Sequence, residues 1–462
     1  MTSTSGGAVA AGADDIDVAI IGAGAAGLAA AIFAAERAAE LGRAVRIAVF
    51  DGAPKLGAKI LISGGGRCNV TNVRVTADDF NGPRPTIRNV LATFDADAAV
   101  RWFADLGVAL KAEPGGKRFP TTDRAATVLD ALVARAAARG VDVRTRARVD
   151  AIEPVLAPGP PAGGAGAEGG GAAGRAPHAV AGYDADAAFD LAVGPDIVRA
   201  RRVVLATGGR SLPRTGSDGG GYALAARLGH TVTPTFPALV PLVLAADFFH
   251  AELSGVSHPA ELTTTAGGKV VDRRAGSLLW THFGVSGPVV LDASRHWLAA
   301  RLAVGAAELR LSLLPGRDAA GADAWLAEAA HQDGRRPVGA VVAGAVPERV
   351  ARRLCAVAGV DPAMRLAELA RPARRALAEA LGALALPVVG DRGWDFAEVT
   401  AGGVPLAEVD HRTMASRRAP GLHLAGEVLD VDGRIGGFNF HWAWATGRLA
   451  GRGAVAGLGR HD

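Results

Sequence analysis

The chain has 462 residues, of which 49% are hydrophobic and 21% are charged, and its formal net charge is only +4. This balance is typical of a globular protein with a large core, long enough for two or three domains. The basic residues are mostly arginine and form no basic run, so the composition predicts no nucleic-acid partner and no polybasic membrane contact.

Cysteine usage and the first residues indicate the compartment. The two cysteines, Cys68 and Cys355, lie far apart, which argues against a disulfide framework and favours a reduced, cytoplasmic setting. The first fifteen residues lack the basic segment of a secretory signal. Residues 16–35 are apolar enough to suggest a membrane span, but their glycines and the preceding aspartates favour a buried strand and loop. We therefore expect no membrane partner.

The first predicted elements are a strand at residues 18–21, a glycine loop, a helix that ends at 41 and a second strand at 45–50. This order is typical of a dinucleotide-binding unit. Within the loop, three glycines have separate expected roles: a tight turn, close approach of a pyrophosphate, and close packing of helix on strand. In chain order these are Gly22, Gly24 and Gly27.

The helix start and the second strand supply the other contacts expected of this unit. N–H groups and the positive dipole end at Ala25 and Ala26 suit phosphate groups. Asp51 ends the second strand about 20 residues after the glycines, where an acid accepts ribose hydroxyls. The alternative is a purely structural glycine turn in an alanine-rich protein.

A second glycine loop at residues 61–72 is dense in hydrogen-bond donors. In a dinucleotide fold it falls beside the pyrophosphate and reaches the far end of the cofactor. We expect contacts from Gly65, Gly66, Arg67, Cys68, Asn69, Thr71 and Asn72. No second cysteine is near Cys68, so we interpret it as a small packed side chain rather than a redox thiol.

Residues 122–206 combine a predicted helix and predicted strands with one stretch of biased composition. Residues 122–140 predict a capped helix, and residues 141–155 predict a strand. Residues 157–182 consist mainly of Pro, Gly and Ala, and predict a flexible insertion. Strands resume at 189–191 and at 202–206.

The strand at 202–206 leads into a Thr-Gly-Gly turn, in which the backbone passes close to the adenosine end of a dinucleotide. We expect cofactor contacts at Thr207, Gly208 and Gly209. Residues 216–222 then open a helix at 223–228. This is either a second phosphate cradle for NAD(P)H or a loop of the same domain, and we favour the loop because no ribose acid follows it.

From residue 236 the pattern changes to short strands, and later to helices broken by prolines. The sequence therefore predicts an inserted domain at 236–395, with a β-rich part at 236–315 and a helical part at 320–390. Within it, His282 is flanked by Trp, Phe and two glycines, which suggests a loop shaped around a ligand.

The C-terminal segment matches the first nucleotide unit. A strand ends in an acid, and a glycine pair then opens a helix; these residues are Gly426, Glu427, Gly436, Gly437, Phe438 and Asn439. FAD is long enough to need both chain ends. The acid would hydrogen-bond the ribitol, and the helix start would stabilise negative charge at the flavin pyrimidine edge.

The sequence therefore predicts an α/β fold with a Rossmann-like FAD-binding domain built from both chain ends, residues 1–235 and 396–462. An inserted β-barrel plus helical-bundle domain lies between them.

Nearly end to end, the sequence resembles the BaiN/YhiN-type bacterial flavoproteins, a family of NAD(P)/FAD-dependent oxidoreductases with aminoacetone-oxidase-like members. The resemblance rests on residues 20–27, 64–72, 118–120, 206–209, 281–288, 400–404 and 426–447. It implies the same FAD domain with an inserted β-barrel and helical subdomain. It leaves the substrate open between enone-type reduction and amine oxidation.

The expected chemistry is hydride transfer at flavin N5 to or from a small organic molecule, with NAD(P)H as the electron donor and no metal. The candidate catalytic residues are His282, His441 and Arg67. His282 is either a general acid or a packed histidine. Arg118 and Arg124 either anchor an anionic substrate or are simply solvated.

Two other classes of function compete with this interpretation. One is a non-catalytic FAD protein that acts as a redox sensor or structural flavoprotein. The other is an RNA-modifying flavoprotein, which would need a basic, aromatic-bearing surface that no single stretch of the sequence supplies. The oligomeric state is left open.

Overall fold

The computed structural model describes residues 16–155 and 188–459, so the insertion predicted at 157–182 lies outside the described residues. Two units are present, each with its own hydrophobic core. Unit 1 combines the chain up to Thr235 with the chain from Gly402 onward. Unit 2 is Phe236–Ala401, which extends beyond the insert boundary placed at residue 395 because the strand at 399–401 pairs with the strand at 236–238.

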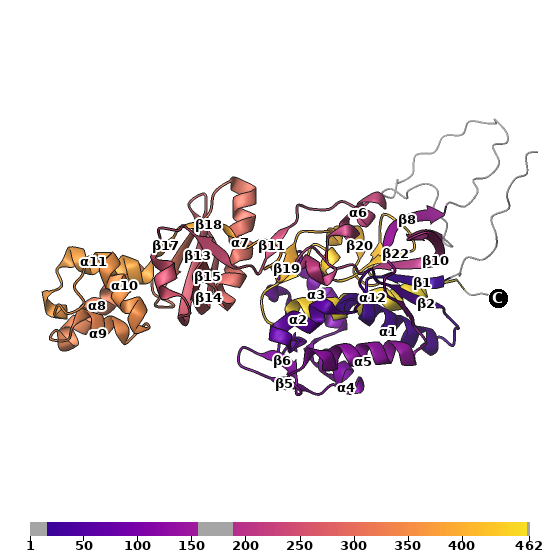
Figure 1. Cartoon of the computed structure of the whole chain (residues 1–462), viewed down its shortest axis with the longest axis horizontal. Coiled ribbons are helices and arrows are strands. Elements are labelled where there is room, and N and C mark those ends of the chain that lie inside the picture. The colour runs from indigo at the N-terminus through magenta and orange to yellow at the C-terminus, as the bar shows by residue number, and fades with distance from the viewer. Residues whose placement is uncertain (1–15, 156–187, 460–462) are drawn as a thin grey trace, which may run out of the picture. The chain divides into compact units, whose positions relative to one another are not determined.

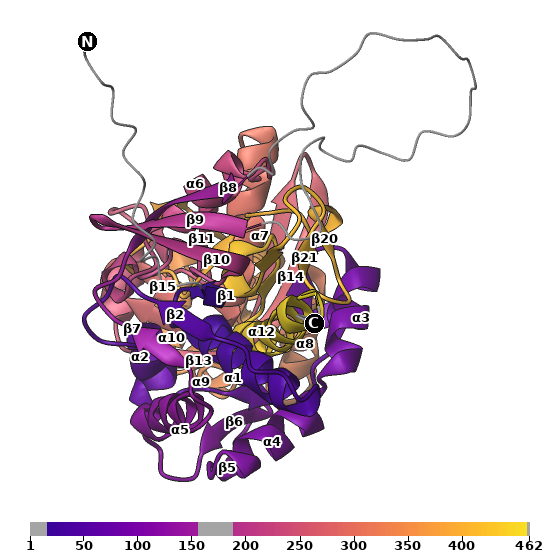
Figure 2. The same ribbon diagram turned by 90° about the vertical axis from the view of Figure 1, so that its right-hand side faces the viewer.

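The centre of unit 1 is a parallel sheet, whose strand order β22-β10-β1-β2-β7 is visible in part in Figure 2. Its parallel strands are β1 (Ile16–Ile21), β2 (Ile47–Phe50), β7 (Asp142–Arg144), β10 (Asp196–Leu205) and β22 (Leu422–Leu424). In the middle, Ile20 pairs with Val204 on one side and Val49 on the other, and all three are fully buried. Such strands are continuously apolar because both sheet faces are covered.

Parallel strands end at one edge of a sheet, and ligands bind there in folds of this kind. The carboxyl ends of β1, β10 and β22 meet at that edge, which brings Gly22, Ala206 and Ala425 to one place although they are up to about four hundred residues apart. This is the edge on which the two predicted nucleotide segments converge.

The other elements of unit 1 either extend this sheet as antiparallel strands or lie around it (Figure 1). The helices are α1 (Ala25–Glu40), α2 (Ala58–Gly66), α3 (Arg84–Thr93), α4 (Ala96–Asp105), α5 (Ala125–Ala138), α6 (Gly220–Arg227) and α12 (Phe438–Ala456). The remaining strands are β3 (Thr71–Asn72), β4 (Phe80–Asn81), β5 (Leu110–Ala112), β6 (Lys117–Pro120), β8 (Val149–Val155), β9 (Ala188–Val193), β20 (Val409–Asp410), β21 (Ala415–Ser416) and β23 (Asp432–Gly433).

The strand predicted at 141–155 is two strands. β7 joins the parallel sheet, whereas β8 pairs antiparallel with β9. The chain turns between them, and Arg146 there has a φ of 54°. A left-handed residue interrupts an extended segment, and an apolar pattern alone does not reveal it.

Unit 2 contains a seven-stranded antiparallel sheet and a group of helices. Its strand order is β17-β16-β13-β14-β15-β12-β18, with β12 (Leu242–Leu244), β13 (Ser257–Ala266), β14 (Lys269–Thr281), β15 (Gly284–Ser286), β16 (Glu308–Ser312), β17 (Leu384–Leu386) and β18 (Val388–Asp391). Helix α7 (Pro288–Val304) packs against β13 and β14. Only Pro387 separates β17 from β18, so one extended segment pairs with β16 through β17 and with β12 through β18. The strand order therefore returns to its starting point, as the predicted barrel requires.

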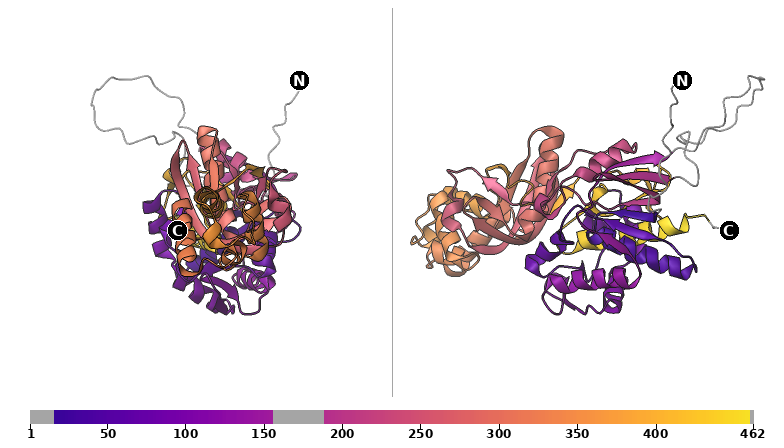
Figure 3. Two further views of the ribbon diagram at one scale, coloured as in Figure 1. Left: turned by 90° about the vertical axis from the view of Figure 1, so that its left-hand side faces the viewer. Right: turned by 45° about the vertical axis from the view of Figure 1, so that its right-hand side comes forward.

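The helical part of unit 2 consists of α8 (Ala319–Asp333), α9 (Val338–Ala343), α10 (Glu348–Val357) and α11 (Arg371–Gly382). In Figures 1 and 3 these orange helices form a bundle beyond one end of the sheet of the same unit. Two further strands, β11 (Phe236–Ala238) and β19 (Val399–Ala401), pair antiparallel where the chain enters and leaves the unit.

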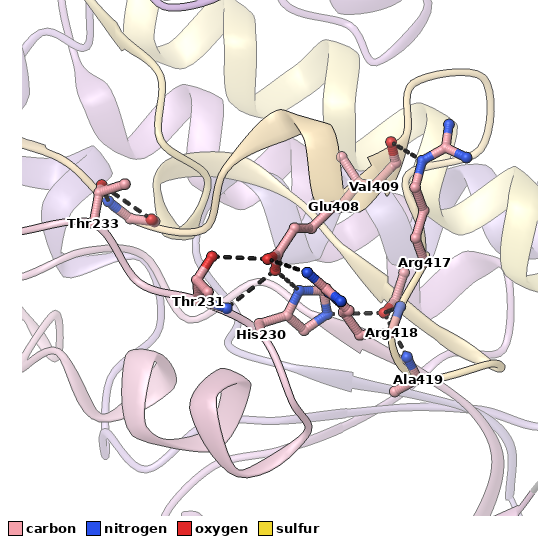
Figure 4. A network of polar contacts seen from close by, with 10 residues as sticks. His230, Thr231, Thr233, Glu408, Val409, Arg417, Arg418 and Ala419 are labelled. Atoms are coloured by element: carbon pink, nitrogen blue, oxygen red, sulfur yellow. Dashed lines mark hydrogen bonds and ion pairs between the residues drawn. The ribbon is translucent and has the colours of Figure 1, made fainter. Parts of the chain in front are cut away.

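A buried polar network holds the C-terminal segment of unit 1 to the segment after α6 (Figure 4). The Glu408 carboxylate accepts hydrogen bonds from the Thr231 N–H at 3.1 Å, the Thr231 hydroxyl at 2.7 Å and the Arg418 guanidinium at 3.1 Å, and it contacts His230 Nδ1 at 2.8 Å. The other ring nitrogen of His230 lies 2.8 Å from the Ser416 hydroxyl. Burial lowers the pKa of His230 although Glu408 opposes this.

Candidate cofactor site

The three glycines of the first loop are needed for different reasons. Gly22 has a φ of +102°, and a Cβ there would lie 2.5 Å from the carbonyl oxygen of Ala206. A Cβ on Gly27 would collide with the carbonyl oxygen of Gly22. Gly24 has an ordinary φ of −80°, and a Cβ there would meet no atom within 4 Å. Neither backbone conformation nor packing within the protein requires glycine at position 24, so its missing side chain leaves space for a bound group.

The start of α1, which the helix dipole makes positive, faces this space. Its N-cap is Gly24, which provides no side-chain hydrogen bond, and its first turn contains no acidic residue. The first N–H groups of a helix have no partner within it, and the helix dipole makes this end positive. The arrangement at Ala25 and Ala26 therefore suits a diphosphate.

Asp51 lies beside the same loop, at the end of β2. One carboxylate oxygen accepts a hydrogen bond from the Ala23 N–H at 2.7 Å, and the other accepts one from the Ala53 N–H at 2.8 Å. Each oxygen retains a lone pair for a second donor. Asp51 is thus oriented to accept ribose hydroxyls next to the diphosphate position.

The Thr207 hydroxyl independently indicates that a ligand binds at this edge of the sheet. It follows β10 and adjoins Gly22, and its hydroxyl oxygen is buried without a hydrogen-bond partner among the described residues. Gly221 passes so close that any Cβ there would collide with this oxygen. Gly208 has a φ of 75°, and the Gly209 carbonyl accepts from the Gly219 N–H at 3.1 Å, so the turn is held firmly. A buried unpaired hydroxyl is costly unless a ligand pairs with it.

Helix α12 runs parallel to α1 and begins farther out. A Cβ on Gly447 would lie 2.5 Å from the Ala26 carbonyl oxygen, and one on Gly451 would collide with the Ala30 carbonyl oxygen, so residue numbers rise together along the contact. Nine residues separate Gly447 from the helix start at Phe438, so the start of α12 lies about 13 Å beyond the start of α1 at 1.5 Å per residue. An extended dinucleotide spans such an offset.

The glycine loop after β2 is exposed and open. Helix α2 breaks at Ser63, and Gly64, Gly65 and Gly66 then have φ values of 57°, 68° and 84°. Only glycine adopts such a run readily. A Cβ on Gly65 would meet no atom within 4 Å, so this backbone is accessible to a ligand lying over it.

Polar side chains predicted to contact the cofactor tie this loop to the start of α12. In the amide orientation that satisfies both ends of Asn69, its nitrogen donates to the carbonyls of Thr71 and Arg118, and its oxygen accepts from the Gly437 N–H at 3.0 Å. The Asn72 amide donates to the Gly436 carbonyl at 3.0 Å. These side chains therefore position the Gly436–Gly437 turn.

Two residues near the start of α12 are engaged within the protein. His441 is fully buried, with Nε2 2.9 Å from the Phe94 carbonyl and Nδ1 2.9 Å from the Thr71 hydroxyl. Since a carbonyl only accepts, Nε2 carries the proton and Nδ1 accepts. Burial lowers the pKa of His441 to about 4. Asn439 donates to the Gly433 carbonyl and accepts from the Gly433 N–H, both at 2.8 Å.

Arg67 and Cys68 lie side by side in unlike surroundings. The half-exposed Arg67 guanidinium stacks on the Phe119 ring at 4.0 Å and pairs with Glu113 at 2.8 Å. Cys68 is fully buried, and burial raises the pKa of its thiol to about 12. A neutral buried thiol is a poor nucleophile.

Glu427 belongs to a group of three side chains, of which the sequence predicted only this one. The Lys59 ammonium donates to Glu427 Oε2 and to the Ser211 hydroxyl, each at 2.6 Å, and that hydroxyl donates to Glu427 Oε1 at 2.9 Å. Lys59 lies in the first turn of α2 and Ser211 follows the Thr-Gly-Gly turn. Lysine is rare in this arginine-rich chain, which was the one available signal for Lys59.

Three further predicted residues lie on other elements of the two units. Arg118 is on β6, and Arg124 is the exposed N-cap of α5. His282 belongs to unit 2, where it is exposed in the two-residue turn between β14 and β15, edge-on to Phe283. Unit 1 thus assembles the predicted nucleotide residues from both chain ends.

The residues of unit 1 fit FAD. The space at Gly24, the orphaned Thr207 hydroxyl and the two offset helix starts each match one part of an extended flavin dinucleotide. Within residues 16–155 and 188–459, no three His, Cys, Asp or Glu residues are placed to hold a metal ion. None of the described helices has the length and apolar character needed to span a bilayer.

Comparison with known proteins supports this interpretation. The family model described as the HI0933-like protein Rossmann domain matches residues 16–156 and 169–453. A 3-dehydro-bile acid delta(4,6)-reductase from Clostridium scindens is 33% identical, with 95% of this chain and 98% of that protein covered. A ribosomal RNA dihydrouridine synthase from Escherichia coli is 32% identical, with 93% and 96% covered, and the one from Haemophilus influenzae is 29% identical, with 92% and 95% covered.

These relatives overturn the exclusion of a nucleic-acid partner. Two proteins similar to this chain over more than nine-tenths of its length act on ribosomal RNA. The exclusion relied on the absence of a basic run in the sequence. Phosphate binding needs cations that are close in space, and a fold supplies these from separate segments.

Proposed function

Because the chain belongs to the HI0933-like family of flavoprotein oxidoreductases, we propose that it is an FAD-dependent reductase of a carbon–carbon double bond conjugated to a carbonyl group. A bile acid Δ4,6-reductase and a dihydrouridine synthase both carry out this type of reaction. When bound, FAD supplies the hydride from N5. The alternative of a non-catalytic sensor or structural flavoprotein is disfavoured by these enzymatic relatives.

The observation that carries the proposal is the offset between the two uncapped helix starts. The start of α1, with the space at Gly24, holds the diphosphate, and Asp51 accepts the ribose hydroxyls. The start of α12 has no side-chain cap and no acidic residue in its first turn. Its N–H groups and dipole stabilise negative charge at the pyrimidine edge of the ring, which favours hydride donation.

The remaining side chains have positioning roles in this proposal. Lys59 and Ser211 hold the Glu427 carboxylate in place beside the ribitol. Asn69 and Asn72 fix the Gly436–Gly437 turn. Arg67, with five fixed donors, is the cation of the glycine loop that can hydrogen-bond a substrate carbonyl oxygen. His441, with both ring nitrogens engaged, is assigned to the scaffold.

NAD(P)H is the proposed electron donor. The one strand-helix-strand unit with a ribose acid in the described residues is that of β1, α1 and β2. The nicotinamide would therefore react transiently at the same ring before the substrate replaces it.

An anaerobic absorbance experiment tests the proposal. The purified holoprotein is mixed with NADPH, and then with either a 3-oxo-Δ4 steroid or a uridine-containing RNA transcript. Loss of the flavin band with NADPH and its return with one of the two acceptors is the expected result. A band that bleaches and does not return with either acceptor would favour a sensor, and a protein without a flavin band would overturn the assignment.

His282 is proposed as the proton donor that completes the reduction. An exposed imidazole at a turn can transfer a proton from a ring nitrogen to a substrate carbon. His282→Ala should leave FAD affinity unchanged and slow turnover by about 10²-fold or more. His331→Ala, an exposed histidine on α8, is the matched control and should turn over normally. Unchanged turnover in His282→Ala would exclude this role.

A further inference from the structure

The guanidinium of Arg392 in unit 2 lies against two aromatic rings and has no polar partner. Arg392 directly follows β18, and its backbone N–H donates to the Pro241 carbonyl at 3.1 Å. The half-buried guanidinium lies over the Phe283 ring at 4.2 Å and over the Phe396 ring at 3.8 Å. Its side chain makes no hydrogen bond or ion pair with any described residue. Because ring contacts use the faces of the planar guanidinium, the N–H groups at its edge can still bind an anion.

The chain around Arg392 is fixed by backbone contacts. Asp391 Oδ1 accepts a hydrogen bond from the Gly393 N–H at 2.6 Å, and Gly393 has a φ of 74°. The Asp391 carboxylate is therefore directed to the backbone of the turn. Asp395 and Glu398, the other acids of this segment, are engaged with other residues. Because the turn and the two rings restrict the side chain, Arg392 loses little conformational freedom when an anion binds.

Phe396 provides an exposed aromatic surface beside this guanidinium. The residue is 47% exposed, and Arg392 covers one face of its ring, so the rest of the ring is open to a ligand. His282 lies edge-on to Phe283 at 5.2 Å, and its exposed imidazole makes no hydrogen bond with the described part of the chain. We call His282, Phe283, Arg392 and Phe396 the Arg392 patch. It combines unpaired donors with an open ring.

A planar ring that carries a phosphate matches this combination. Guanidinium pairs with phosphate through two parallel hydrogen bonds, and an aromatic side chain stacks on a nucleotide base. In dinucleotide-binding proteins, an arginine near the ribose accommodates the 2′-phosphate that distinguishes NADP from NAD. FAD occupies the unit of β1, α1 and β2 in the proposed function, and the described residues hold no second unit of this kind with a ribose acid. A second nucleotide therefore needs a different type of site.

We propose that the Arg392 patch binds the adenosine 2′-phosphate end of NADPH, with Arg392 on the phosphate and the adenine stacked on Phe396. This inference rests on the proposed function, in which a nicotinamide nucleotide reduces FAD, and it names NADPH rather than NADH as the donor. NADH lacks the 2′-phosphate and leaves the Arg392 donors unpaired. His282, the proposed proton donor, belongs to the same patch, so the nucleotide and the acceptor occupy it in turn.

Direct binding to the full-length holoprotein tests the site. Adenosine 2′,5′-bisphosphate is titrated by calorimetry, and adenosine 5′-monophosphate, which lacks the 2′-phosphate, is the comparison. Arg392→Ala should weaken binding of the bisphosphate about tenfold or more and change that of the monophosphate less than about threefold. Phe396→Ala should weaken both at least about fivefold, because both lose the stacked base.

Arg301→Ala is the matched control. Arg301 is another exposed arginine of unit 2, and its guanidinium lies over the Trp297 ring at 4.7 Å. The variant should bind both nucleotides within about threefold of the wild type, the scatter expected of surface substitutions. Equal affinity of the wild type for the two nucleotides, or a similar loss of bisphosphate binding in Arg301→Ala and Arg392→Ala, would overturn the inference.

The two half-reactions separate this inference from the proposed function. In anaerobic bleaching of the flavin, Arg392→Ala should raise the NADPH concentration for half-maximal rate about tenfold and shift that for NADH by less than about threefold. An equal shift for both nucleotides would contradict the 2′-phosphate assignment. Reoxidation of dithionite-reduced flavin by a free 3-oxo-Δ4 steroid involves no nucleotide and tests the reductase alone. A defect of Arg392→Ala confined to that step would assign Arg392 to the acceptor instead.

Discussion

A Cβ on Gly447 of α12 would lie 2.5 Å from the carbonyl oxygen of Ala26 in α1. The first and last helices of the described chain are therefore in backbone contact. One turn further along, Gly451 meets the Ala30 carbonyl in the same way. The cofactor site is complete only when α12 has docked on α1, because each helix contributes one of the two uncapped ends.

Gly447→Val should separate these helices. The added side chain has no space against the Ala26 carbonyl, and overpacking of this kind costs about 1 to 3 kcal/mol of unfolding free energy. FAD affinity should fall with it, because the helix starts shift. Guanidinium denaturation and FAD titration measure both effects. Gly457→Ala, at a position of ordinary φ and ordinary contacts, is the control, and an equal loss there would contradict the explanation.

Gly24→Val should weaken FAD binding and leave the stability of the apoprotein nearly unchanged. The backbone at Gly24 is extended and a Cβ meets no protein atom, so the apoprotein should unfold within about 1 kcal/mol of the wild type. The side chain would occupy the proposed diphosphate position, so the FAD dissociation constant should rise at least about tenfold, a change of about 1.4 kcal/mol. Fluorescence titration with FAD decides the matter, and an unchanged constant would remove Gly24 from the site.

Stability should fall as the pH decreases from about 6.5 towards 4. Burial lowers the pKa of His441 to about 4, with a partly opposing hydrogen bond to the Phe94 carbonyl, and His423 behaves alike. Unfolded histidine titrates near 6.5, so below that pH the unfolded state binds protons that the folded state does not. Each residue contributes a loss on the order of 3 kcal/mol at the lower end, at about 1.36 kcal/mol per pKa unit.

Denaturant titrations at several pH values measure this loss. His441→Gln removes one titrating group, so the variant should be less stable at neutral pH yet depend less steeply on pH. A variant with the wild-type slope would show that acid unfolding is governed by other groups.

Cys68→Ala should retain flavin reduction. Burial raises the pKa of the Cys68 thiol to about 12, so little thiolate exists at neutral pH. The native protein should resist iodoacetamide, since Cys355 is buried as well. Mass spectrometry checks the labelling, with guanidinium-unfolded protein as the positive control. Loss of NADPH-dependent bleaching in Cys68→Ala, with FAD still bound, would reveal a redox role instead.

Glu408→Gln should destabilise unit 1. The nearly buried carboxylate accepts from Thr231 and Arg418 and contacts His230, and an amide nitrogen in place of one oxygen would face donors (Figure 4). We expect a loss of about 2 to 4 kcal/mol in unfolding free energy. Asp190→Asn, which breaks an exposed pair with Arg199, is the comparison and should cost at most about 1 kcal/mol.

Local patterns predicted the parts of the site that depend on backbone conformation. The glycine loop and the helix after it fall between the start of β1 at Ile16 and Asp51, so periodicity and glycine spacing specify them within one short stretch. The second glycine pair before α12 was found in the same way. The sequence did not reveal which side chains bond to each other, because partners far apart in the chain leave no local pattern. Lys59 bonds to Ser211 and Glu427, which are 152 and 368 residues away in the sequence.

The same limit applies to His441. Its place beside the second glycine pair suggested a side chain available for catalysis, but its hydrogen-bond partners Thr71 and Phe94 come from the other end of the chain. When common residues are brought together only by the fold, their shared function cannot be predicted from sequence periodicity.

Phe236 and Ala401, the first and last residues of unit 2, are paired across β11 and β19. Because the two ends of unit 2 lie next to each other, the unit can be inserted into unit 1 at the position of a single loop. Such a module can be gained, lost or exchanged in evolution while the host sheet keeps its register. A chimaera that carries the 236–401 segment of a relative is therefore a practical way to exchange this unit between members of the family without altering the residues of the flavin domain.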